Sequence, residues 1–347
     1  MTPINTAILS FGMSGQIFHA PFLQVVPGFN FYAVWERTKN SAGQKYPSVK
    51  TYRTLQELLA DPAVELVVVN TPNYTHYEYT KSALLAGKHV VVEKPFVVTV
   101  AEGEELIALA KQQNKVLSVY HNRRFDSDFR TIREILQEGW LGTIVEAEFH
   151  YDRYKPELSP KVHKETPGPG TGALYDLGSH LIDQALTLFG MPHAVFADIR
   201  IVRPLSKVDD YFEVLLYYPD KRVRLHSSYL VREPLPSYSI HGSLGSFIKA
   251  RTDVQEAALQ AGMTPDAPDW GVEPDKEKGL LHTEKEGKQI RELITSLRGN
   301  YGDFYEQLEK AISAGGPNPV SPEHGLNVIR IISASFKSSK EKAVVQL

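Results

Sequence analysis

One lysine and one aspartate–histidine pair are the side chains of this sequence best suited to moving a proton. Lys94 stands in Glu93-Lys94-Pro95, directly after three valines, and Asp176 precedes His180 by four residues. On an α-helix that spacing places two side chains one turn apart on one face. Imidazole titrates near neutral pH, and a lysine can donate to a substrate oxygen or transfer a proton when its pKa is lowered. These residues therefore predict general acid–base chemistry.

Each motif also has a purely structural interpretation. Lys94 could be a solvated lysine at a strand end, and Asp176 an acid favoured by a helix N-terminus beside an incidental histidine. Asp176, His180 and Asp183 could instead bind a metal, but no fourth ligand is evident and we expect no metal site. Pro95 predicts a fixed turn, with a cis peptide bond as one form of it.

A glycine-rich turn follows the first strand-like segment. Ser10-Phe11-Gly12-Met13-Ser14-Gly15 matches G-x-G-x-x-G except that Ser10 replaces the first glycine. In this motif Gly12 lets the backbone approach a pyrophosphate, Gly15 allows close helix–strand packing, and the helix N-terminus attracts the phosphates. Glu36 and Arg37 end the next strand-like segment, where an acid binds ribose hydroxyls and an arginine can pair with a 2′-phosphate. The pattern predicts NAD or NADP, the alternative being an ordinary strand–helix turn.

Two smaller groups of polar residues also follow strand-like segments. Thr71-Pro72-Asn73 and His76 come after the third, and Tyr120-His121-Asn122-Arg123-Arg124 ends the last one before residue 122. Carboxyl ends of parallel strands are where ligands bind, so both groups could line a cleft. Either could equally be a helix cap or a solvated basic turn.

The elements that must position these residues change character near residue 122. Before it, short apolar segments alternate with helical ones, which predicts a doubly wound parallel sheet. The expected strands are Ala7–Ser10, Phe29–Trp35, Leu66–Asn70, His89–Glu93 and Val116–Tyr120. The expected helices are Gln16–Val25, Leu55–Leu59, Tyr77–Leu85 and Ala101–Gln112.

After residue 122 the pattern predicts an α+β domain with an open, mainly antiparallel sheet. The expected helices are Asp126–Gln137 and Leu174–Phe189, and the expected strands are Ile144–Tyr154, Ala194–Val202, Tyr211–Tyr218, Arg222–Val231 and Tyr238–His241. We interpret Ala261–Lys288 as a long surface excursion. The predicted domains are 1–122, which binds the dinucleotide, and 123–347, which binds substrate and supports oligomerisation.

Composition excludes several classes of protein. The chain has 347 residues and no cysteine, which excludes disulfides, thiolate catalysis and iron–sulfur clusters. Its net charge of −3 offers no basic excess for nucleic acid. We find no membrane-length apolar run and no signal peptide, and expect a cytoplasmic protein.

The chain resembles the glucose–fructose oxidoreductase / inositol dehydrogenase (Gfo/Idh/MocA) family over essentially its whole length. The resemblance rests on four motifs in their order along the chain: the Ser10–Gly15 turn, Thr71-Pro72-Asn73 with His76, Glu93-Lys94-Pro95, and Asp176 with His180. The run Tyr151–Pro156 is similar to the branch containing NADP-dependent scyllo-inositol dehydrogenases. The resemblance implies a Rossmann domain, a second domain with an open sheet, and a homodimer or homotetramer. Glu36 departs from the family's more usual aspartate.

The resemblance also assigns site residues. It implies that Lys94, Asp176 and His180 are catalytic. Cofactor would be bound by Ser10, Gly12, Met13, Ser14, Gly15, Glu36, Arg37, Thr71, Pro72, Asn73, His76, Glu93, Lys94 and Asn122. Independently of the resemblance, we expect substrate to be bound by Arg123, Tyr151, Arg153, Tyr175, Asp176 and His180.

The expected activity is hydride transfer between NAD(P) and a secondary alcohol of a cyclitol, sugar or polyol, with a scyllo-inositol-like substrate favoured. An NAD-dependent glycosidase of the same fold is one alternative, and a non-catalytic NAD(P) sensor is another. The proton-transfer group argues against the sensor. The expected partners are a small polyol or sugar and further copies of the chain, without nucleic acid or membrane.

Overall fold

The computed structural model describes residues 2–347, apart from the side chain of His163. They form two compact units. Unit 1 takes residues up to Phe125 with Val254–Trp270 and Asn300–Leu326, and unit 2 takes Asp126–Asp253, Gly271–Gly299 and Asn327–Leu347. The C-terminal part of the chain thus contributes to both units. The assignment of 1–122 and 123–347 as the two functional domains stays a prediction.

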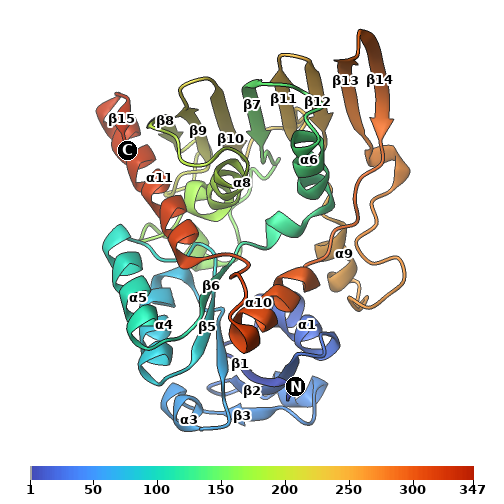
Figure 1. Cartoon of the computed structure of the whole chain (residues 1–347). Helices are drawn as coiled ribbons and strands as arrows, with labels where there is room; N and C mark the ends of the chain where they lie inside the picture. Colours follow the sequence, from blue (N-terminus) through green and yellow to red (C-terminus); the bar gives the residue numbers. More distant parts are fainter. Residues whose placement is uncertain (1) are drawn as a thin grey trace. The chain divides into compact units, whose positions relative to one another are not determined.

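Unit 1 is built on a six-stranded, wholly parallel sheet with the strand order β3-β2-β1-β4-β5-β6 (Figure 1). The strands are β1 (Ile4–Ile8), β2 (Phe29–Trp35), β3 (Lys50–Tyr52), β4 (Leu66–Val69), β5 (His89–Glu93) and β6 (Leu117–Tyr120). All the valines of β4 and β5 are fully buried, as expected for strands covered on both faces. The order reverses at β1 and β4, where such sheets bind ligands. The predicted doubly wound fold is confirmed, and β3 was not predicted.

The helices of unit 1 come from both ends of the chain. They are α1 (Ala20–Val25), α2 (Ser41–Lys45), α3 (Leu55–Ala60), α4 (His76–Leu85), α5 (Val100–Gln112), α9 (Val254–Gln260) and α10 (Gly302–Ala314). Capping boxes begin α3 at Thr54 and α5 at Thr99. The edge strand β6 is covered by the segment after α10, since Val119 N–H donates to the Val320 carbonyl at 3.1 Å.

Unit 2 contains a nine-stranded sheet with the order β14-β13-β12-β11-β7-β10-β9-β8-β15. Within this sheet, β7–β10 is the one parallel pair among the described residues, which confirms a mainly antiparallel sheet. The strands are β7 (Ile144–His150), β8 (Ala194–Arg200), β9 (Tyr211–Tyr217), β10 (Arg222–Ser228), β11 (Tyr238–Gly242), β12 (Gly245–Lys249), β13 (Gly279–Lys285), β14 (Lys288–Ile294) and β15 (Val345–Gln346). The helices are α6 (Ser127–Gln137), α7 (Val162–Glu165), α8 (Ser179–Phe189) and α11 (Pro322–Glu341), the last from Asn327 onward.

Our interpretation of Ala261–Lys288 as a surface excursion was wrong at its C-terminal end. Residues Gly279–Lys285 form β13, which pairs with β12 and β14. Figure 1 shows β13 and β14 side by side as a long hairpin.

The two faces of the second sheet differ in polarity. Alternate residues of its central strands, such as Phe212, Val214 and Leu216, are fully buried within the unit. The opposite side, here called the polar face, carries Glu148 and His150 on β7, Arg224 and His226 on β10, and Glu213, Leu215 and Tyr217 on β9. No helix of the described residues is long and apolar enough to cross a membrane.

Candidate cofactor pocket and catalytic residues

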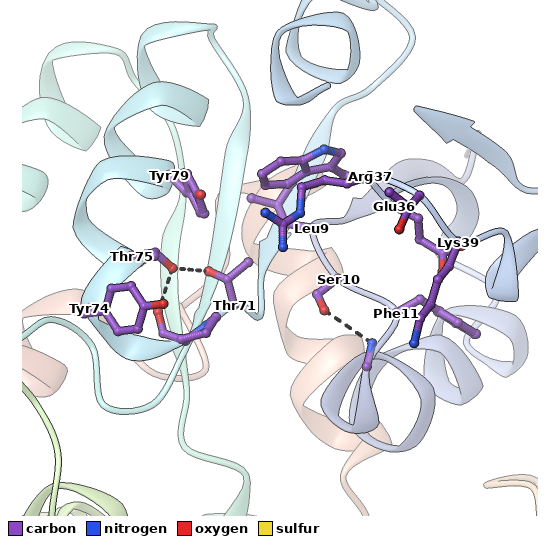
Figure 2. A pocket seen from close by; sticks show the side chains of 14 residues that line it. Leu9, Ser10, Phe11, Glu36, Arg37, Lys39, Thr71, Tyr74, Thr75 and Tyr79 are labelled. Carbon is purple, nitrogen blue, oxygen red and sulfur yellow. Dashed lines mark hydrogen bonds between the residues drawn. The ribbon is translucent and has the colours of Figure 1, made fainter. Parts of the chain in front are cut away.

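A pocket of about 420 Å³ lies in unit 1 at the carboxyl ends of β1, β2 and β4 (Figure 2). Six of the predicted cofactor residues line it: Ser10, Gly12, Glu36, Arg37, Thr71 and Pro72. Eight residues outside the prediction complete its wall: Leu9, Phe11, Trp35, Thr38, Lys39, Tyr74, Thr75 and Tyr79. The structure thus brings three separate sequence segments to one cavity.

The glycine-rich turn has a steric reason for Gly15. A Cβ atom there would lie 2.2 Å from the Ser10 carbonyl oxygen, so no other residue fits without moving the backbone. A Cβ at Gly12 would meet only the Ser10 hydroxyl oxygen, at 3.5 Å, so the protein alone leaves room at this position. The Ser10 hydroxyl accepts a 3.3 Å hydrogen bond from Gly12 N–H, which closes the turn without the first glycine. The turn then enters a π-helix, η1 (Gly15–His19), a form that is frequent at functional sites.

The carboxylate of Glu36 is already engaged within the protein. Its two oxygens accept hydrogen bonds from the backbone N–H groups of Ser41 and Ala42, at 3.2 and 3.0 Å. Glu36 therefore caps the N-terminus of α2 and is only 8% exposed. Arg37 and Lys39 are exposed beside it, so this end of the pocket presents cations (Figure 2). Sequence reasoning missed Lys39, although its place two residues after Arg37 was a usable signal.

Aromatic side chains form another part of the wall. The rings of Trp35 and Tyr79 meet edge to face with their centroids 5.5 Å apart. Both residues line the pocket. Such rings offer an apolar surface for a flat heterocycle such as adenine. The cavity, the cations and the open backbone at Gly12 together fit a dinucleotide.

Glu93 joins the glycine-rich turn to the end of β5. Its Oε1 accepts a 2.6 Å hydrogen bond from the Ser14 hydroxyl and lies 3.1 Å from Nε2 of His19. Burial opposes ionisation of Glu93, but the bonds from His19 and Ser14 outweigh it and lower the pKa of the carboxyl. Nδ1 of His19 lies 2.6 Å from the Tyr305 hydroxyl. Glu93 is therefore a charged link in a buried network that sequence reasoning did not anticipate.

The strand ends beside Glu93 are braced by His76. Its ring nitrogens lie 2.8 Å from the Pro95 carbonyl oxygen and 3.0 Å from that of Thr71, and burial lowers its pKa. His76 is 1% exposed and is not among the residues lining the pocket, so its visible role is structural. The Lys94–Pro95 bond is cis, as anticipated, and the Lys94 side chain is half-buried.

The remaining predicted residues of unit 1 lie outside the pocket wall. Arg123 is 6% exposed and is bound by Tyr301 at 2.9 Å and by Glu256 at 2.7 Å. These bonds give Arg123 a structural role. Asn122 is also buried and begins the 3₁₀ turn η3 (Asn122–Phe125), whereas Asn73 begins η2 (Asn73–Thr75). Met13 is 50% exposed at the start of the helix that follows the turn.

In unit 2, a second π-helical turn, η4 (Leu174–Gly178), precedes α8 and carries Tyr175 and Asp176. Its first N–H is capped by Asp209, whose Oδ2 accepts from Leu174 N–H at 2.8 Å. Gly172 has a φ of +101°, and a Cβ there would lie 1.8 Å from Oδ1 of Asp209. Burial raises the pKa of Asp209 to about 6.

The π-helical turn alters the expected stacking of Asp176 and His180. A spacing of four residues places two side chains one turn apart only where the helix is α-helical throughout. Here Asp176 lies in the wider π-helical turn, whereas His180 lies in α8. Asp176 forms an ion pair with Lys164 at 2.8 Å, and His180 is 6% exposed. Among the described residues, the group with metal-binding potential is His150, Asp152 and His226, not the Asp176–His180–Asp183 set considered from sequence.

Tyr151 connects His180 to two arginines. Its ring lies 6.4 Å from that of His180, between centroids. The guanidinium groups of Arg153 and Arg251 lie 5.1 and 4.4 Å from the Tyr151 ring centroid, in cation–π range. Arg251 also lies 4.7 Å from the ring of Tyr238, and no hydrogen-bond partner of its guanidinium is found among the described residues.

The surroundings of Asp176 in unit 2 are cationic. The pKa of Lys155 is lowered, chiefly by the neighbouring charge of Arg153 and then by burial and by Lys164. The negative charge of Asp176 acts in the opposite direction and raises this pKa. Tyr175 stacks on Phe336, with ring centroids 5.8 Å apart. The structure therefore gathers five of the six predicted substrate residues, all but Arg123, around one end of η4 and β7.

Comparison with known proteins agrees with this arrangement. Residues 4–121 match the family model "Oxidoreductase family, NAD-binding Rossmann fold" of GFO_IDH_MocA, and residues 133–347 match its C-terminal alpha/beta domain. The chain is 41% identical to scyllo-inositol 2-dehydrogenase (NADP(+)) IolW of Bacillus subtilis, over 99% of this chain and 96% of that protein. It is 38% identical to the uncharacterized oxidoreductase YdgJ of Escherichia coli, over 99% of each chain.

Solved structures give the same result. An oxidoreductase from Bacteroides fragilis superposes with a TM-score of 0.92 at 48% identity, covering 99% of this chain and 100% of that one. The NAD(P)-binding fold and the family matches identify an NAD(P)-dependent dehydrogenase or reductase acting on CH–OH groups. The chain belongs to the Gfo/Idh/MocA family of oxidoreductases.

Proposed function

We propose that this protein oxidises a secondary hydroxyl of a cyclitol, with scyllo-inositol or a close relative as substrate, and that it prefers NADP. The observation that carries the cofactor preference is the engagement of Glu36 by Ser41 and Ala42. An acid held by backbone amides is less able to bind the ribose hydroxyls or to repel a 2′-phosphate. The exposed Arg37 and Lys39 then offer that phosphate a charge-assisted contact.

Support for the substrate comes from the Bacillus subtilis relative, a scyllo-inositol 2-dehydrogenase, and from the groups around η4. Tyr151, Arg153, Tyr175 and Asp176 provide hydroxyl, guanidinium and carboxylate groups. A ring bearing a hydroxyl on every carbon requires several such donors and acceptors. Arg123 is less suited to this role, because Glu256 and Tyr301 already bind it.

We propose that His180 accepts the proton of the reacting hydroxyl, and that Lys94 and Asp176 position the substrate. When bound, the nicotinamide accepts the hydride. His180 would take the hydroxyl proton, since a mostly buried imidazole can act as a base without competition from bulk water. Lys94 would donate to the hydroxyl oxygen, and Asp176 would fix a neighbouring hydroxyl. The assignment of these three residues to one reaction rests on the family's motifs.

Further copies of the chain are the proposed partners, as a homodimer or homotetramer. The cytoplasmic location stays a prediction from the sequence.

The experiment is a substrate panel. The purified protein is incubated with scyllo-inositol, myo-inositol and several aldoses, each with NADP⁺ or NAD⁺, and the absorbance of reduced nicotinamide is followed. The proposal expects the largest kcat/KM for an inositol with NADP⁺. A higher kcat/KM for an aldose would contradict the substrate class, and a higher value with NAD⁺ would contradict the cofactor preference. Release of phenol from nitrophenyl glycosides would indicate the glycosidase alternative.

A further inference from the structure

Two histidines and an aspartate meet on the polar face of the second sheet. β7 and β10 run parallel, and their register places His226 directly beside His150. Asp152 lies two residues after His150 and therefore points to the same side. The side chains of His150, Asp152 and His226 are 8%, 3% and 19% exposed, so the cluster is largely shielded but reachable from solvent.

The spacing of the three groups suits a metal ion. Nδ1 of His150 lies 3.2 Å from one oxygen of Asp152, and Nδ1 of His226 lies 3.0 Å from the other. One ligand atom from each residue can be chosen so that all three lie within 4.8 Å of one another. Ligand atoms bound at about 2.0–2.2 Å around a tetrahedral ion lie about 3.3–3.6 Å apart. The 3.2 and 3.0 Å between the histidine nitrogens and the Asp152 oxygens are close to this spacing.

We propose that His150, Asp152 and His226 form a binding site for a divalent transition-metal ion, with Zn²⁺ as the best-suited ion. Two imidazole nitrogens and one carboxylate oxygen are ligands that Zn²⁺ accepts, and a water molecule would complete four-coordination. The site is separate from the residues assigned to proton transfer. Its existence does not depend on the proposed dehydrogenase activity.

The residues around the cluster resemble the outer layer of a metal site. Nε2 of His150 lies 3.5 Å from Glu148, which Arg224 holds by a 2.6 Å ion pair. A carboxylate that binds one imidazole nitrogen keeps the proton there and leaves the other nitrogen free for a metal. Oδ1 of Asp152 also accepts from Ser228 N–H at 3.0 Å, which orients the carboxylate.

Without a metal, the same groups form a hydrogen-bonded cluster in which the imidazoles donate to Asp152. Metal binding requires each Nδ1 to lose its proton, either to solvent or to Nε2 of the same ring. Protons therefore compete with the ion, and affinity should fall as the pH is lowered.

An ion at this position would fasten the end of β7 to β10. Tyr151 and Arg153, two of the proposed substrate residues, flank Asp152 in the sequence. Their backbones are already tied to β10, since Tyr151 N–H donates to the His226 carbonyl and Arg153 N–H to that of Ser228, both at 2.9 Å. The metal would add a side-chain link to these backbone bonds.

The test is a calorimetric titration of Zn²⁺ into the full-length, tag-free protein after chelator treatment. We expect one ion per chain. Glu148→Gln changes a residue that contacts a ligand but not the ion, so it should weaken Zn²⁺ binding about 10–100-fold. His226→Ala removes a ligand and should weaken Zn²⁺ binding more than that. His282→Ala is the matched control, because His282 is an exposed histidine of β13 outside the cluster. Its affinity should equal that of the wild type.

Absence of Zn²⁺ binding by the wild-type protein would overturn the proposal. So would equal affinity in the wild type and a folded His226→Ala variant, because the ion would then be bound elsewhere. If circular dichroism shows that His226→Ala is misfolded, Co²⁺ decides the question in folded protein. The site is supported if Co²⁺ gives the wild type a visible absorption band that is shifted in Glu148→Gln. The site is contradicted if the wild type shows no such band, or if the band is the same in both proteins. A dehydrogenase assay reports on the separate functional proposal.

Discussion

The Ser14 hydroxyl donates a 2.6 Å hydrogen bond to the carboxylate of Glu93, across 79 residues of sequence. This bond joins the turn after β1 to the end of β5. The second oxygen of Glu93 accepts from Lys94 N–H at 3.2 Å. Glu93 thus ties the glycine-rich turn to the backbone of the predicted catalytic lysine.

Neutralising Glu93 should therefore weaken cofactor binding. Glu93→Gln keeps the side chain's shape but removes the charge that Ser14 and His19 face. We expect the Kd for NADP to rise about 10-fold, corresponding to the loss of about 1–1.5 kcal/mol from charge-assisted bonds. Fluorescence titration of the protein measures this. Glu65→Gln is the control, since Glu65 also accepts a backbone N–H, from Asn5 at 2.9 Å, in an exposed position. Equal Kd values for Glu93→Gln and wild type would contradict the role of Glu93.

Arg37 should distinguish the two cofactors. Arg37→Ala should weaken NADP binding by about 1–3 kcal/mol and NAD binding much less, because only NADP carries a 2′-phosphate. Parallel titrations with both cofactors measure the difference, and Arg291→Ala, on exposed β14, is the control. An equal loss for NADP and NAD would show that Arg37 does not read the 2′ position.

Asp209 should make stability depend on pH. Burial raises its folded-state pKa from 3.8 to about 6. Between these values the folded state binds more protons than the unfolded state, so wild-type stability falls as the pH rises through this window. The side chain of Asp209→Asn does not titrate, so the variant's free energy of unfolding relative to wild type should rise between pH 4 and 6. The rise should be at most about 3 kcal/mol, the free energy that corresponds to a pKa shift from 3.8 to about 6.

Urea unfolding of both proteins at several pH values measures this difference. Asp275→Asn, at an aspartate that is 90% exposed and pairs with Lys278 at the surface, is the control and should show little change across the same range. A stability difference between Asp209→Asn and wild type that does not vary with pH would contradict the account.

The polar face of the second sheet should take part in self-association. Leu215 and Tyr217 lie on it among charged side chains, a mixture typical of interfaces between subunits. Leu215→Arg should shift a dimer or tetramer towards monomer, as measured by sedimentation equilibrium. Leu205→Arg, in an exposed loop of unit 2, should not. A wild-type monomer at micromolar concentration would contradict the oligomer.

Much of the first sheet could be predicted because its strands are encoded locally. The valines of β4 and β5 are apolar on both faces, a pattern typical of strands in a parallel sheet covered by helices. The β13–β14 hairpin could not be predicted in the same way. Most residues of β14 are exposed, and its charged side chains resemble those of a surface loop. Strand pairing, rather than burial, forms this element.

The site shows the same limit. The Ser10–Gly15 turn and the place of Arg37 in the pocket wall could be predicted, because both follow from near neighbours in sequence. The engagement of Glu36 could not, because its partners are backbone N–H groups at the start of a five-residue helix. Nor could the bond between His19 and Tyr305, whose residues are 286 positions apart. The π-helical turn at Asp176 also has no sequence signal that we recognise.

His180 provides the most direct test of the central claim, that this chain oxidises a cyclitol hydroxyl by transferring its proton to this imidazole. The measurement is kcat for scyllo-inositol with saturating NADP⁺, in wild type and His180→Ala, beside the exposed-histidine control His282→Ala. The account predicts measurable wild-type turnover, a loss of about 10²–10⁴-fold in His180→Ala, and unchanged turnover in the control. The Kd for NADP should stay within about 2-fold, a free-energy change of about 0.4 kcal/mol. Near-normal turnover in a folded His180→Ala, or no scyllo-inositol-dependent reduction of NADP⁺ by the wild type, would contradict it.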